Sequence, residues 1–158
     1  MKTTPLFPYS FRRPGWVLVT LGMLTAILPI LFPTLGDLFD ARIPALVAEG
    51  FMDDRRDWLV IIENNLQDES IAFLVILGGL LVCFSREKQE DEFIARLRLD
   101  ALLWATYINY GLLLVALFTV YELSFFYIMV ANLFTLLFMF YIRFRYLLMI
   151  TRKQIDHA

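Results

Sequence analysis

The feature that most constrains this chain is a series of four apolar segments, each close to the length that crosses a membrane and each bounded by charged residues. A membrane-spanning helix needs about 20 mostly apolar residues. Apolar residues make up 59% of the 158-residue sequence, and the mean hydropathy is +0.66, which is more than a soluble domain of this size requires. We therefore predict an all-α, polytopic membrane protein with four transmembrane helices, at about residues 15–32, 69–85, 101–121 and 123–142.

The second segment is the weakest of the four. Its apolar part, Ile71–Phe84, reaches only about 21 Å as a helix, against roughly 30 Å of hydrocarbon. We expect the helix to extend into Asp68, Glu69 and Ser70, because acidic and hydroxyl residues are favoured at a helix N-terminus. Whether this segment spans the bilayer fully stays open.

The distribution of charge predicts the orientation in the membrane. Eleven of the fourteen cations fall before the first segment, between the second and third, or after the fourth, whereas residues 34–70 carry three cations against nine acids. Lys and Arg collect on the cytoplasmic side. We expect cytoplasmic N and C termini, an outer loop at 34–70, a cytosolic segment at 86–100 and a cytosolic tail at 143–158. We prefer an uncleaved first span to a cleaved signal peptide, because its apolar core is too long for one.

The outer loop contains two stretches that we predict to be short helices. The first is 43–52, with Pro44 near its start and Gly50 near its end, as in a short interfacial helix. In the second, 53–66, four apolar residues recur at helical spacing and predict an amphipathic helix. These residues are Trp58, Ile61, Ile62 and Leu66.

The segment 86–100 carries nine charges. Lys88, Glu92, Arg96 and Asp100 are four residues apart and alternate in sign, which favours pairing along one face of a helix continuous with the third span. A solvated helical face is the simplest interpretation. The functional alternative is that an apolar face on the same helix docks a partner, and its candidate residues are Phe93, Ile94 and Leu97.

The third and fourth spans contain the main intramembrane polar groups. Counted outward from the turn near Tyr121, Asn109 and Asn132 fall at similar depth, so we expect them to hydrogen-bond across the helix pair. Such amides usually hold helices together. The alternative is a polar site for a small molecule or lipid headgroup, with candidate residues Thr106, Asn109, Tyr110, Asn132 and Thr135.

The sequence offers little material for catalysis or metal binding. It has one cysteine, Cys83, and one histidine, His157. A cysteine or histidine metal cage is therefore excluded within this sequence, and no serine, cysteine or aspartate has a base beside it in the pattern. We predict no catalytic residues, no metal and no cofactor. The acids of the outer loop match no calcium-binding loop.

The run Ser85–Arg98, followed by a helix pair bearing Tyr and Asn and by a basic aromatic tail, resembles small four-span bacterial inner-membrane proteins. The resemblance covers Ser85–Lys153. It implies a bacterial cytoplasmic membrane and brings no activity, ligand or catalytic residue.

These observations favour a single domain, 1–158, that is not an enzyme. Our leading hypothesis is an integral membrane accessory or regulatory protein whose cytosolic helix and tail bind a protein partner or a second copy. The alternative is a small-molecule or lipid-binding bundle, or a transport component, that uses the polar site. The lipid bilayer is the expected environment, and we expect no nucleic-acid partner.

Overall fold

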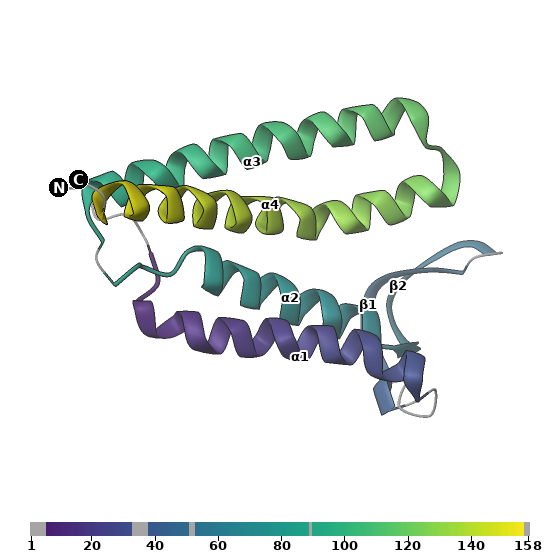
Figure 1. The fold of residues 1–158 in the computed structure, drawn as a ribbon. Coiled ribbons are helices and arrows are strands. Elements are labelled where there is room, and N and C mark those ends of the chain that lie inside the picture. Colours follow the sequence, from purple (N-terminus) through teal and green to yellow (C-terminus); the bar gives the residue numbers. More distant parts are fainter. Residues whose placement is uncertain (1–5, 33–37, 51–52, 89, 157–158) are drawn as a thin grey trace. The chain divides into compact units, whose positions relative to one another are not determined.

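The computed structural model of the chain describes residues 6–32, 38–50, 53–88 and 90–156, so His157 lies outside the described residues. Within these ranges the chain is mostly helical, with one two-stranded sheet (Figure 1). In chain order the elements are a short 3-10 helix η1 (Tyr9–Phe11), α1 (Arg12–Leu31), β1 (Asp40–Gly50), β2 (Asp53–Asn65), α2 (Gln67–Cys83), α3 (Glu92–Thr119) and α4 (Glu122–Asp156).

Among the described residues, three helical stretches are long and apolar enough to cross a membrane, which indicates a membrane protein. They are Tyr9–Leu31, Glu92–Thr119 and Glu122–Thr151. α2 begins in the polar flank of its apolar run, as expected, with Asp68 and Glu69 in its first turn. Its 17 residues reach about 25 Å, which is still short of the hydrocarbon thickness of roughly 30 Å. The fourth span therefore stays a prediction.

The chain forms two compact units, one made of Met1–Val19 with Val75–Ala158 and the other of Thr20–Leu74. The boundaries fall inside α1 and α2, so each of these helices contributes a part to each unit.

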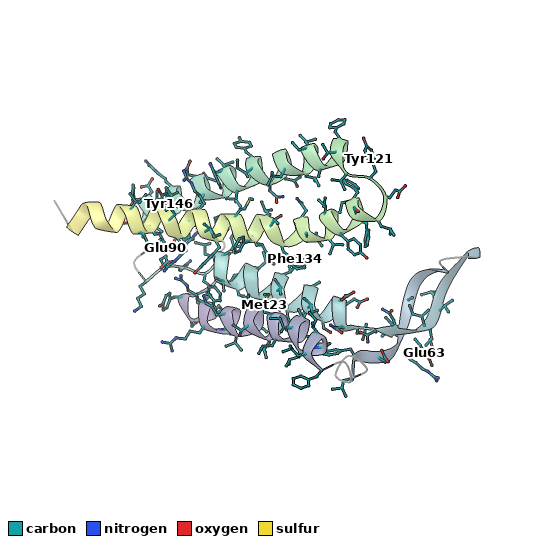
Figure 2. The ribbon with its side chains drawn as sticks, turned by 45° about the vertical axis from the view of Figure 1, so that its right-hand side comes forward. Met23, Glu63, Glu90, Tyr121, Phe134 and Tyr146 are labelled. Carbon is teal, nitrogen blue, oxygen red and sulfur yellow. The ribbon has the colours of Figure 1, made fainter. Side chains whose placement is uncertain are left out.

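In the first unit, α3 and α4 run side by side in opposite directions and are joined by a turn at Val120 and Tyr121 (Figure 1). Glu122 adopts a positive φ of 61° at this turn, a conformation that lets the chain reverse within two residues. Figure 2 shows Tyr121 at the turn, with Glu90 and Tyr146 at the opposite end of the pair. We call that opposite end the Arg98 end, after the buried residue described below.

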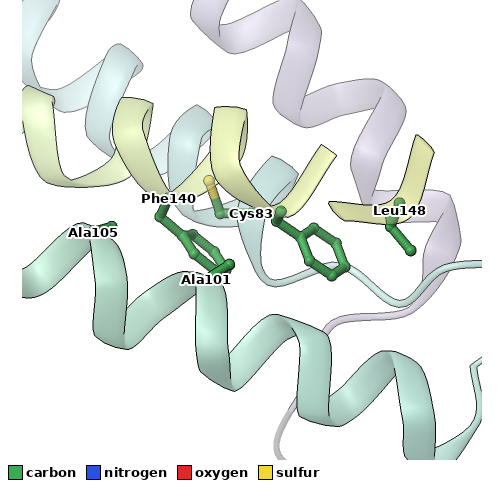
Figure 3. Packing of buried hydrophobic residues seen from close by; sticks show 6 residues of the cluster. Cys83, Ala101, Ala105, Phe140 and Leu148 are labelled. Atoms are coloured by element: carbon green, nitrogen blue, oxygen red, sulfur yellow. The ribbon is translucent and has the colours of Figure 1, made fainter. Parts of the chain in front are cut away.

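The core of this unit lies where α3 faces α4 and the end of α2 (Figure 3). Ala101 and Ala105 on α3 are fully buried, and the rings of Phe140 and Phe144 on α4 pack against them. Small alanines let the larger rings approach the α3 backbone closely. Phe84, just after α2, stacks on Phe140 with 5.5 Å between the ring centroids, which joins α2 to the same core.

Two glycines bring α1 and α2 together within this unit. A Cβ atom at Gly78 would lie 2.7 Å from the backbone oxygen of Gly15 and 2.8 Å from the backbone nitrogen of Val19. These distances are shorter than any van der Waals contact allows, so this crossing needs glycine at position 78.

In the second unit, the two short helices predicted at 43–52 and 53–66 are wrong, because these residues form an antiparallel hairpin of β1 and β2. Every second side chain is half-buried over residues 41–45 and 60–64, and Ile43 pairs with Ile62 while Ala45 pairs with Val60. β-branched residues on one face stabilise a strand. Residues 51–52 and the side chain of Trp58 lie outside what the structure describes.

The charged segment at 86–100 is helical only in part. α3 begins at Glu92, and Asp91 caps it by accepting a hydrogen bond of 2.8 Å from the backbone N–H of Ile94. From Glu92 onward the segment is continuous with the apolar part of α3, as predicted. Lys88 lies before the helix, above the ring of Tyr9 at 5.8 Å, so its predicted pairing with Glu92 along a helical face is wrong.

The chain after the predicted fourth span stays helical. α4 runs to Asp156 without a break and so includes most of the predicted tail at 143–158. At 35 residues it measures about 52 Å, far longer than the hydrocarbon thickness.

Candidate functional site

The main candidate polar site is a set of buried hydrogen bonds and ion pairs at the Arg98 end. Arg98 is 6% exposed, and its guanidinium makes two hydrogen bonds with Glu90, Nη1 to Oε1 at 2.9 Å and Nη2 to Oε2 at 3.1 Å. Nη2 also donates to the backbone oxygen of Ser85 at 3.4 Å. A paired fork of this kind fixes the direction of both side chains. It ties the connection between α2 and α3 to the second turn of α3.

A second ion pair extends this arrangement to the start of α1. Arg12 donates to Glu87 over 2.8 Å, and both side chains are largely buried. The backbone N–H of Glu87 in turn donates to Oε2 of Glu90 at 2.8 Å. Beside it, Phe7 exchanges backbone hydrogen bonds with the strand-like stretch around Ser85. We call Arg12, Glu87, Glu90, Arg98 and Phe144 the Arg98 cluster.

Phe144 completes the cluster from α4. The guanidinium carbon of Arg98 lies 5.0 Å from the centre of its ring, within the range of a cation–π contact. Nε of Arg98 is buried and has no hydrogen-bond partner in the described part of the chain. In the described residues, Glu90 is the carboxylate that forms a salt bridge with Arg98.

Sequence reasoning missed Arg98, because we counted its charge only toward the orientation in the membrane. A signal was present. On a helical wheel Arg98 falls about 40° from Ile94 and about 20° from Ala105, within the apolar face of α3. A charged residue on an apolar face indicates a buried ion pair, and the acids at 87 and 90 were the available partners.

The three candidate docking residues do not share one environment. Ile94 and Leu97 are half-buried and pack against the core cluster, so this chain covers much of the apolar face that we expected a partner to cover. Phe93 is 52% exposed. Beside it, Arg96 pairs with Glu92 at 2.8 Å, and both of these side chains are highly exposed.

The polar residues between α3 and α4 come together in part. Nδ2 of Asn109 donates to Oδ1 of Asn132 at 3.2 Å, and the hydroxyl of Thr135 donates to Oδ1 of Asn109 at 2.6 Å. We call these three residues the Asn109 group. The hydrogen bond that we expected between the two asparagines is present, and Asn109 is 2% exposed.

The other two candidates of the polar site lie outside this group. Thr106 donates to the backbone oxygen of Leu102, one turn earlier on the same helix. Tyr110 is 56% exposed and points away from the buried side of α3. Both polar atoms of the Asn109 amide therefore bond within the helix pair, and the Asn109 group has the form of a contact between helices.

The hairpin carries a hollow of about 410 Å³ lined by polar residues. Its side chains already bond to one another. Arg42 pairs with Glu63, and Asn65 donates to Asp40 at 2.8 Å. The residues that line it are Asp40, Ala41, Arg42, Glu63, Asn64 and Asn65.

In the described ranges, no three His, Cys, Asp or Glu residues are grouped so that they could hold a metal ion. No protein-family model, curated protein or solved structure matches this chain. Any function must therefore be argued from the side chains themselves.

Proposed function

We propose that this chain is a non-enzymatic integral membrane protein that binds a partner through the start of α3 and the end of α4. The partner is another protein or a second copy of the chain. In the proposed orientation the Arg98 end is cytosolic, and the protein acts as an accessory or regulatory subunit.

The observation that carries this proposal is the combination of a fixed helix start with an exposed aromatic side chain. Asp91 caps α3, and the pair Arg98–Glu90 holds the preceding connection in place. On this fixed base, Phe93 leaves half of its surface uncovered. An exposed aromatic residue on a fixed helix start is a favourable anchor for a partner, because the backbone that carries it does not have to become ordered on binding.

The charges of the first unit support the proposed orientation. Arg12 pairs with Glu87 of the Arg98 cluster. Arg86 and Lys88 belong to the connection before α3, where Ser85 bridges to Phe7 and Lys88 lies over the ring of Tyr9. Arg143 and Arg145 belong to the same end of α4. Such an accumulation of cations is typical of a cytoplasmic face. We propose four crossings of a cell inner membrane, with both ends in the cytoplasm and α2 as the short fourth span.

The geometry favours partner binding over the alternative of a ligand site between α3 and α4. Nδ2 and Oδ1 of Asn109 both make hydrogen bonds within the helix pair, and the hollow described above is lined by residues of the hairpin. A ligand at Asn109 would first have to replace these hydrogen bonds.

The test compares two exposed apolar residues of the same helix. Phe93→Asp should abolish the complex, because it places a charge at the centre of the contact. Leu99→Asp is the matched control, because Leu99 is 58% exposed and points about 120° away from Phe93 around α3.

Native mass spectrometry of protein purified from its own membrane in mild detergent is the measurement. We expect a stoichiometric partner, or a defined oligomer, in the wild type and in Leu99→Asp. A complex that survives in Phe93→Asp, or that is lost equally in both variants, would contradict docking through this face.

A further inference from the structure

Arg143 occupies an unusual setting on α4. Its guanidinium carbon lies close to two aromatic rings, 5.1 Å from the ring centre of Trp104 on α3 and 5.9 Å from that of Tyr146 one turn later on α4. Nε is buried and has no hydrogen-bond partner in the described part of the chain. A guanidinium has five N–H donors and no acceptor, so the arrangement holds the charge in place without neutralising it.

Neighbouring acids do not provide this neutralisation. Asp100 lies one turn before Trp104 on α3, yet it forms no salt bridge with Arg143 in the described residues. The contrast with Arg98 is clear, because that guanidinium has a carboxylate on its fork and an aromatic ring on its face. Arg143 has the aromatic rings and lacks the anion.

The position of Arg143 along α4 points to the source of that anion. Counted from Glu122, at the turn, it lies about 31 Å along the helix, which equals the hydrocarbon thickness of roughly 30 Å. If the turn lies at one membrane surface, Arg143 lies at the level of the lipid phosphates of the other. Trp104 and Tyr146 are then at the depth where amphipathic rings are enriched.

Trp104 and Tyr146 also add polar hydrogens to the site. Both side chains are partly exposed, at 41% and 50%, and each carries one polar hydrogen, on the indole nitrogen and on the phenol oxygen. Both groups act as donors when an acceptor is near. A phosphate, with several acceptor oxygens, can accept from the guanidinium and from these donors together.

We infer that Arg143, Trp104 and Tyr146 form a binding site for the phosphate of an anionic phospholipid. The rings hold the guanidinium at the height of the headgroups, and the lipid supplies the missing negative charge. An anionic lipid is favoured over a zwitterionic one because no choline or ethanolamine cation offsets its phosphate. The inference requires membrane insertion and is independent of partner binding through Phe93.

The experiment is a competition between lipids on the purified protein. Equal amounts of phosphatidylglycerol and phosphatidylcholine with identical acyl chains are added in detergent, and the lipids retained are counted by native mass spectrometry. We expect one phosphatidylglycerol to be retained preferentially by the wild type. Arg143→Gln should weaken its retention roughly tenfold, the size expected for hydrogen bonds to a charged group.

Arg145→Gln is the matched control. Arg145 is also half-buried and lies two residues after Arg143 on α4, but it lacks the pair of aromatic rings. It should keep the preference. Arg143→Lys keeps the charge without the planar fork and should retain the lipid to an intermediate degree, which separates loss of the site from loss of folding.

Three results would overturn the inference. One is equal weakening in Arg143→Gln and Arg145→Gln, which would indicate general attraction of anionic lipid to a basic surface. Another is equal retention of the two lipids by the wild type. The third is binding of inorganic phosphate, added to delipidated protein, that depends on Arg143 while lipid binding does not.

Discussion

The Arg98 cluster and the Asn109 group differ in how they satisfy polar atoms on the same helix face. They are separated by about 16 Å along α3, and both central residues are almost fully buried. In the cluster a cation and an anion neutralise each other. In the Asn109 group neutral amides and a hydroxyl share hydrogen bonds. The comparison teaches that the effect of a substitution depends on whether the group that loses its partner is charged or neutral.

A buried ion that loses its partner costs far more folding free energy than a buried amide that loses its partner. Arg98 would keep its charge, because a guanidinium does not lose its proton in proteins. Loss of the Asn109 side chain would leave only uncharged polar groups without a partner. One of them, the hydroxyl of Thr135, has a second acceptor in the backbone oxygen of Asn132 at 3.2 Å. We therefore expect the cluster to be the more sensitive of the two.

The largest effect is expected from Glu90→Gln. This change removes the negative charge but keeps the shape, so Arg98 is left buried and unpaired. Breaking a buried pair in this way costs about 3 to 5 kcal/mol of folding free energy. Unfolding of the purified protein in mixed micelles, followed by helical circular dichroism during titration with a denaturing detergent, measures the loss.

The double variant Glu90→Gln with Arg98→Met sharpens this prediction. It removes both charges and leaves an apolar side chain of similar length over Phe144, which is close to neutral for many buried pairs. Most of the lost stability should return. If the double variant is as unstable as Glu90→Gln alone, the unpaired charge is not the cause, and the cluster acts through its hydrogen bonds to the backbone.

A smaller effect is expected from Asn109→Leu. Hydrogen bonds between membrane helices contribute about 0.6 to 2 kcal/mol each, and a leucine also packs well beside Ala105. The same unfolding titration should show a loss within this range. Native mass spectra of the variant and the wild type should show the same bound small molecules. Disappearance of a discrete ligand mass in Asn109→Leu would revive the ligand site that the geometry disfavours.

Most of the helical fold was predictable, because a long apolar run by itself predicts a helix of membrane-spanning length. The hairpin was not. Its second strand contains Val60, Ile61 and Ile62, a short apolar run that fits a helical period and an alternating one equally well. Burial resolves the ambiguity, because Val60 and Ile62 are half-buried while Ile61 is exposed. The enrichment in β-branched residues was the signal to weigh more strongly.

The candidate sites divide along the same lines. The pairing of Asn109 with Asn132 could be predicted, because one turn fixes the depth of residues on both helices. For the Arg98 cluster, the position of Arg98 on the apolar face signalled a buried ion pair. The choice of partner was not predictable, because it depends on the connection before α3, where Ser85 forms a bridge with Phe7. A regular charge spacing also suggested one long ladder. Because α3 begins at Glu92, the pair Glu92–Arg96 is the part of this predicted ladder that forms a salt bridge in the described residues.

The smallest effect is expected from Glu92→Gln, which removes the partner of Arg96. This pair is as short as the Arg98 pair, with 2.8 Å between Nη2 and Oε1, but it makes one hydrogen bond instead of two, and both side chains are more than three-quarters exposed. Water solvates either charge when the other is absent, so exposed pairs four residues apart contribute only about 0.3 to 0.5 kcal/mol. The unfolding titration should barely distinguish this variant from the wild type. A loss as large as that of Glu90→Gln would mean that exposure is not what separates the two pairs, and that the charge at position 92 acts instead through the N-terminus of α3.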